Sequence, residues 1–160
     1  MKFKKIEFAR QTNFILGLLL IHFVFFGYLA NTYHPPFASY KGIGERVLFL
    51  YQVLFSPYTY LSAIILGVIV FIMAFREQFF EYGIRNSIWL IPFIIIESWI
   101  WYFFIIERFD ITVIGMYFLR IESYITIVSL FGINLFAAFL AAIAKEKYKT
   151  YLTKVKIIKR

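Results

Sequence analysis

Three polar residues stand alone inside long apolar stretches of this chain: His22, Glu97 and Asn134. A carboxylate can accept a hydrogen bond from an imidazole N–H, and a carboxamide can satisfy a remaining lone pair. An ionisable group in the middle of a membrane span is costly, and is by default a functional-site hypothesis. A cluster of the three side chains would be able to relay protons, bind a cation or hold a polar ligand.

A structural interpretation of the same residues stays open. Polar side chains inside a membrane also hold helices together, at about 1 kcal/mol per hydrogen bond. Trp101 lies four residues after Glu97, and Phe104 continues that helix face, so aromatic rings accompany the carboxyl group. Such rings can line a cation site, but in a chain that is 22% aromatic they more commonly pack against neighbouring helices.

The apolar residues come in uninterrupted runs, as in membrane-spanning helices. The chain has 160 residues and 62% of them are hydrophobic, which is more than a soluble domain usually contains. We predict an all-α, four-transmembrane-helix bundle that forms a single membrane domain over 1–160. The first run is too long for the core of a signal peptide, so we interpret it as an uncleaved span. The predicted spans are 13–30, 58–75, 88–106 and 123–144.

These spans place the three polar residues at similar depths. His22 is nine residues from the start of its span at Asn13, and Glu97 is nine from Ile88. Asn134 is ten residues from Ala144, at the end of the fourth span. Because the rise per residue of a helix is nearly constant, equal offsets predict one layer of the bundle that contains all three.

The connections contain further apolar segments that are too short to cross. We expect 46–55 to form an interfacial or re-entrant helix and 111–119 to lie at the membrane surface beside it, while 76–86 is predicted to be a loop. Small residues at helical spacing predict close contacts between helices. These are Ala63 and Gly67 in the second span and Ala137, Ala138 and Ala141 in the fourth.

The positive charges predict an orientation. Thirteen lysines and arginines fall in the N-terminal segment, the 76–86 connection and the tail, whereas four fall in the other two connections. The positive-inside rule therefore puts both termini in the cytoplasm. The tail 145–160 has the pattern of a basic amphipathic helix on an anionic leaflet, or of a solvated tail that only sets topology. Its basic residues are Lys145, Lys147, Lys149, Lys154, Lys156, Lys159 and Arg160.

The residues and motifs that several classes of function require are absent from the sequence. The chain has no cysteine, and neither nucleotide-binding nor hydrolase motifs occur. His22 lies inside a span and His34 in a connection, so they do not suggest a shared metal ion. The net charge of +8 has no soluble module to carry nucleic-acid binding. We therefore expect no enzyme activity, no metal, no cofactor and no nucleic acid.

Three hypotheses remain, in order of preference. The first is a non-enzymatic subunit of a homo- or hetero-oligomeric membrane complex that associates with itself or with other membrane subunits. The second is a small proton- or cation-conducting transporter or channel that uses Glu97. The third is a membrane enzyme acting on lipid at the outer surface, through His34, Glu45, Glu107 and Asp110. The usage of phenylalanine, isoleucine and lysine suggests an AT-rich genome, and we expect a prokaryotic cytoplasmic membrane.

Overall fold

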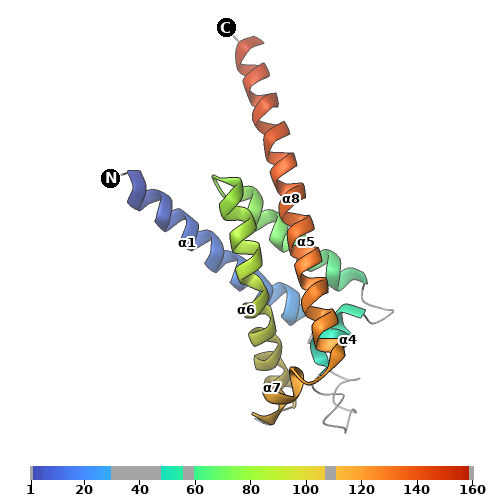
Figure 1. Cartoon of the computed structure of the whole chain (residues 1–160). Helices are drawn as coiled ribbons and strands as arrows, with labels where there is room; N and C mark the ends of the chain where they lie inside the picture. The colour runs from blue at the N-terminus through green and yellow to red at the C-terminus, as the bar shows by residue number, and fades with distance from the viewer. Residues whose placement is uncertain (1, 30–47, 56–59, 107–110, 159–160) are drawn as a thin grey trace.

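Every regular element in the described part of the chain is a helix. The computed structural model describes residues 2–29, 48–55, 60–106 and 111–158. Figure 1 shows the long helices packed in one bundle, with the start of α1 and the end of α8 toward the same end. The predicted all-α architecture is confirmed for these residues. The elements are α1 (Lys2–Leu20), the π-helical segment η1 (Ile21–Phe26), α4 (Phe49–Phe55), α5 (Tyr60–Arg76), α6 (Phe80–Ile106), α7 (Thr112–Tyr117) and α8 (Ile121–Ile158).

Three helices in the described residues are long and apolar enough to cross a membrane. They cover Gln11–Leu29, Phe80–Ile105 and Ile121–Val155. The apolar helix α5 is shorter, with 17 residues. Large apolar side chains are exposed around the bundle, as expected of a surface that faces lipid rather than water. Phe23, Phe104, Val128 and Phe136 are each about two-thirds exposed.

The predicted loop over 76–86 is mostly helical. Helix α5 ends at Arg76 and α6 already begins at Phe80, so the turn between them is very short. Two of the polar residues that suggested a loop are buried and bonded to each other, since Asn86 donates a hydrogen bond to the Glu77 carboxylate. The next residue, Ser87, is also buried and donates to a backbone carbonyl. Because these groups have partners, the helix extends well beyond its apolar run.

Helices α5 and α8 make the most extensive contact in the bundle. Ala138 and Ala141 are buried against Ala74 of α5, and Ala137 is buried in the main core. Gly67 faces α8, where an added Cβ would lie 3.9 Å from the side chain of Ile133, and Ala63 is half-buried. The small residues that the sequence singled out therefore bring two helices of the same chain together.

The short segments belong to the bundle. Helix α4, expected to be an interfacial or re-entrant helix, buries Phe49, Leu50, Val53 and Leu54 and contacts α5, α6 and α8. Helix α7 buries Val113 and Tyr117, and the Tyr117 ring makes an edge contact with Trp99 of α6. Residues 30–47 and 107–110, which include the proposed lipid-active residues His34, Glu45, Glu107 and Asp110, lie outside the described residues.

The basic tail is helical and continues α8 without a break. Helix α8 has 38 residues and extends from the core to Ile158. Figure 1 shows its last turns projecting beyond the other helices along the same axis. The tail therefore does not turn to run across the end of the bundle.

Candidate functional site: the Glu97 and Glu77 carboxylates

His22 and Glu97 meet between η1 and α6. The Nδ1 atom of His22 lies 2.8 Å from Oε2 of Glu97, although the two residues are 75 positions apart in the sequence. His22 sits in the π-helical segment, which displaces the ring from where a regular helix would carry it. Wide turns of this kind often occur at functional sites. The first two members of the predicted trio are thus brought together.

Trp101 completes this site. Its Nε1–H donates to His22 Nδ1 over 3.3 Å, and the two rings lie 5.2 Å apart. Indole N–H is only a donor, and an imidazole nitrogen carries either one lone pair or one hydrogen. Nδ1 therefore either accepts from Trp101 or bonds to the Glu97 carboxyl group, so the two contacts compete for one atom.

The pair is only partly covered by the described residues. The side chains of His22 and Glu97 are 31% and 20% exposed. Phe23 packs edge-on against the histidine ring, and Phe104 packs against Trp101, but both phenylalanines are themselves mostly exposed. The site thus opens on the outside of the bundle, on the face shared by α1, η1 and α6.

A groove lies on the same face, between α1 and α6. Its volume is about 480 Å³, and it is mainly apolar with polar groups from Gln11, Arg85 and Asn86. The groove is lined by Trp89 and Phe93 of α6, and the pair lies beyond it along the contact of α6 with α1 and η1, because Glu97 and Trp101 follow Phe93 at intervals of four residues. We call this surface, from Gln11 and Arg85 to His22 and Phe104, the α1–α6 face.

Asn134 is not part of the pair, and the predicted trio is wrong in this respect. Its side chain is fully buried, and Nδ2 donates to the backbone carbonyl of Ser87 over 2.9 Å. Ser87 precedes Glu97 by ten residues, which is about 15 Å along α6. The depth of Asn134 was counted from Ala144, where the apolar run ends. Helix α8 continues to Ile158, so the end of the apolar run does not show which residues of α6 and α8 lie at the same level.

A second buried carboxylate, Glu77, was missed by the sequence analysis. It is 5% exposed and directly follows α5. Its Oε1 accepts hydrogen bonds from Nδ2 of Asn13 in α1, at 2.8 Å, and from Nδ2 of Asn86 in α6, at 2.9 Å. Asn13 also donates to the backbone carbonyl of Met73. Together these bonds connect α1, α5 and α6.

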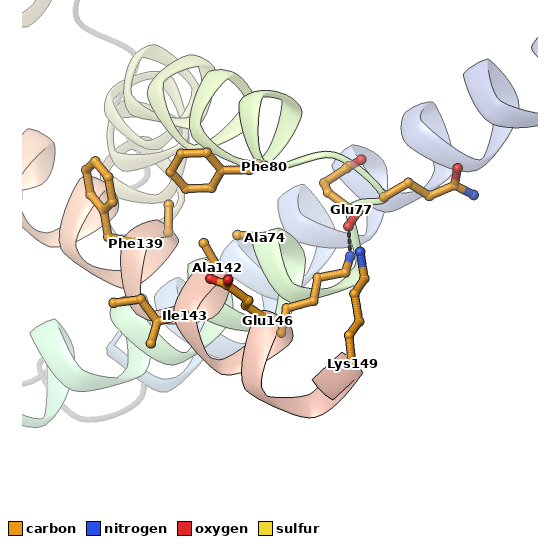
Figure 2. A pocket seen from close by; sticks show the side chains of 12 residues that line it. Ala74, Glu77, Phe80, Phe139, Ala142, Ile143, Glu146 and Lys149 are labelled. Atoms are coloured by element: carbon orange, nitrogen blue, oxygen red, sulfur yellow. Dashed lines mark hydrogen bonds between the residues drawn. The ribbon is translucent and has the colours of Figure 1, made fainter. Parts of the chain in front are cut away.

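Helix α8 joins the same network through Lys145. The Lys145 ammonium donates to the backbone carbonyl of Glu77, as the dashed line in Figure 2 shows. A cation at the carboxyl end of α5 is also favoured by the helix dipole. We call Asn13, Glu77, Asn86 and Lys145 the Glu77 network; it ties four helices at one level of the bundle. In the sequence, Asn13, Glu77 and Asn86 each lie at or next to the end of a predicted span. Polar residues are common at such places, so the sequence contained no specific sign of this network.

The other basic tail residues whose side chains the structure describes are exposed: Lys147, Lys149 and Lys154. The side chains of Lys156, Lys159 and Arg160 lie outside the described part of the chain. Lys145 was predicted to contact anionic lipid, but its ammonium group is hydrogen-bonded within the protein.

No protein-family model, curated protein or solved structure matches this chain. The functional argument accordingly rests on the geometry of the two carboxylates and on the surfaces around them.

Proposed function

We propose that this chain is a non-enzymatic subunit of an oligomeric membrane complex, and that another membrane chain covers its α1–α6 face. The observation that carries the proposal is the partial exposure of the His22–Glu97 pair. A polar pair that faces hydrocarbon is costly, whereas one that faces a protein partner can complete its hydrogen bonds. The adjacent groove gives such a partner a concave apolar surface.

This proposal changes the interface expected from sequence. Ala137, Ala138 and Ala141 of α8 are buried within the chain, and Gly67 of α5 faces α8, so these small residues do not supply an oligomeric surface. The α1–α6 face combines a central polar pair with exposed aromatic side chains. Aromatic side chains are enriched in protein interfaces.

The topology that belongs to this function has four crossings and both termini in the cytoplasm. In support, the Glu77 network lies at one level of α1, α5, α6 and α8, which are joined as alternating up and down helices. The 17 residues of α5 rise about 25 Å, which a slightly thinned bilayer accommodates. The basic residues of the tail then lie inside, as the positive-inside rule requires.

Purification from native membranes in mild detergent tests the subunit proposal. The mass of one chain is 19.1 kDa. We expect the intact assembly to have a mass that is either a multiple of this value or larger by the mass of co-purified chains. A strictly monomeric protein without partners would refute the proposal.

A second function is supported by the same pair: a proton or cation site used in transport. The specific observation is the 2.8 Å contact between two titratable groups within predicted spans. Because one bundle of this size leaves little room for a pathway, this function also needs an oligomer. In liposomes, Glu97→Gln should abolish proton-linked flux while the protein stays folded; unchanged flux in that variant would eliminate this function.

A further inference from the structure

A second groove lies on another side of the bundle, between α8 and the turn that connects α5 to α6. Its volume is about 420 Å³. Figure 2 shows Phe80 and Phe139 at one end and Lys149 at the other. The apolar part is lined by small residues that leave the space open and by larger ones that bound it: Ala74, Gly83, Ala138, Ala142, Phe80, Phe139 and Ile143.

The polar end of this groove presents one cation and one carboxylate that have no partner among the described residues. Lys145 is bonded to the Glu77 carbonyl, and Glu77 itself accepts from Asn13 and Asn86. Lys149 and Glu146 both line the groove and are exposed, but neither ammonium nor carboxylate is hydrogen-bonded within the described chain. In Figure 2 their side chains point in different directions.

The position of the groove along α8 matches the boundary of a membrane. The apolar run of α8 ends at Ala144 and the charged residues begin at Lys145. From Phe139 to Lys149 the helix rises about 15 Å. The apolar residues lie toward the hydrocarbon of the membrane, and the charged residues lie toward water. A molecule that fills the groove must therefore be apolar at one end and charged at the other.

We propose that this groove binds a phospholipid whose headgroup carries both a phosphate and a primary ammonium group. Lys149 donates to the phosphate, and the headgroup ammonium donates to Glu146. An acyl chain lies over Ala138 and Ala142, and the two phenylalanines, whose rings contact each other, close the apolar end of the groove. The choice of phosphatidylethanolamine follows from the charges, because phosphatidylglycerol has no cation for Glu146 and phosphatidylcholine has no N–H to donate.

Native mass spectrometry of the delipidated full chain in mild detergent tests this site. Phosphatidylethanolamine, phosphatidylglycerol and phosphatidylcholine with the same acyl chains are added in separate titrations. We expect one tightly bound phosphatidylethanolamine, with an affinity about tenfold above that of phosphatidylcholine, as the loss of one charge-assisted hydrogen bond predicts. Equal affinities for the three lipids would overturn the proposal.

Charge variants separate this site from general attraction to the membrane. Lys149→Gln should weaken phosphatidylethanolamine binding about tenfold, whereas Lys147→Gln, the same change at an exposed position outside the groove, should alter it less than twofold. Glu146→Gln should weaken phosphatidylethanolamine binding and strengthen phosphatidylglycerol binding. Equal effects of the two lysine variants, or the same sign for both lipids in Glu146→Gln, would contradict the assignment.

An apolar variant tests the acyl chain. Ala142→Phe should fill the groove and abolish the bound lipid, while Leu140→Phe, at an exposed α8 position that does not line the groove, should leave binding unchanged. Both variants must unfold at the wild-type temperature for the comparison to count. Displacement of the lipid by millimolar inorganic phosphate would show a simple anion site and overturn the proposed lipid site.

Discussion

Two carboxylates in the described helices, Glu77 and Glu97, have contrasting surroundings. Glu77 is almost completely covered, and its Oε1 accepts two amide hydrogen bonds from two other helices. Glu97 has one histidine neighbour and remains one-fifth exposed on the α1–α6 face. A closed network that joins several helices holds them in place, whereas an open pair keeps hydrogen-bonding capacity for something outside the chain.

The largest effect is expected from breaking the closed network. Glu77→Ala leaves the side-chain amides of Asn13 and Asn86 buried without their acceptor, which should lower the free energy of unfolding by about 3 kcal/mol. Glu77→Gln keeps an acceptor oxygen and should cost clearly less. Thermal unfolding in detergent measures both, with Glu81→Ala as the exposed control, for which we expect a change within about 0.5 kcal/mol. If Glu77→Ala melts at the wild-type temperature, Glu77 does not stabilise the bundle and this prediction is wrong.

The open pair should respond in the reverse manner. Glu97→Gln removes the carboxyl group but retains a polar side chain, so the free energy of unfolding should fall by only about 1 kcal/mol. The mass of the assembly from native membranes should change instead, because the proposed partner loses the carboxyl group that it would contact. If Glu97→Gln destabilises the fold as much as Glu77→Ala does, the contrast between the two sites fails.

Asn134 separates the pair from the third polar residue that was predicted to join it. Asn134→Ala leaves the Ser87 carbonyl without the side-chain donor and should cost about 1 kcal/mol of stability. Because Asn134 lies about 15 Å from Glu97 along the bundle, it should not alter the assembly mass. In a double variant, the losses of stability caused by Asn134→Ala and Glu97→Gln should add. A strong deviation from additivity would show that Asn134 interacts with the His22–Glu97 pair after all.

The smallest effect is expected from Trp101→Phe. The variant keeps an aromatic ring beside His22 but removes the N–H that donates to Nδ1. We expect a loss of about 0.5 kcal/mol in stability, and a change in the ultraviolet resonance Raman bands of His22 as the ring nitrogen loses a donor. Identical histidine bands in both proteins would show that the indole does not donate to Nδ1.

Sequence reasoning succeeded where one polar residue interrupts an apolar run. The all-helical bundle and the meeting of His22 with Glu97 followed from span lengths and equal offsets. Asn134 was misplaced because the ends of apolar runs do not report where α6 and α8 are in register. Glu77, Asn13 and Asn86 escaped notice because polar residues near span ends are ordinary, and only the packed structure shows that three such ends converge. The tail illustrates the same limit, since composition did not reveal that α8 continues straight through it.

Site-specific photo-crosslinking in native membranes tests the central claim most directly. Phe104, on the α1–α6 face, and Phe136, on α8, are equally exposed, at 68% and 67%. Each is replaced in turn by the photoreactive residue p-benzoylphenylalanine, which preserves the aromatic side chain. The account predicts a covalent adduct with a second protein chain from position 104 and none from position 136. Adducts with lipid alone at position 104 would contradict it.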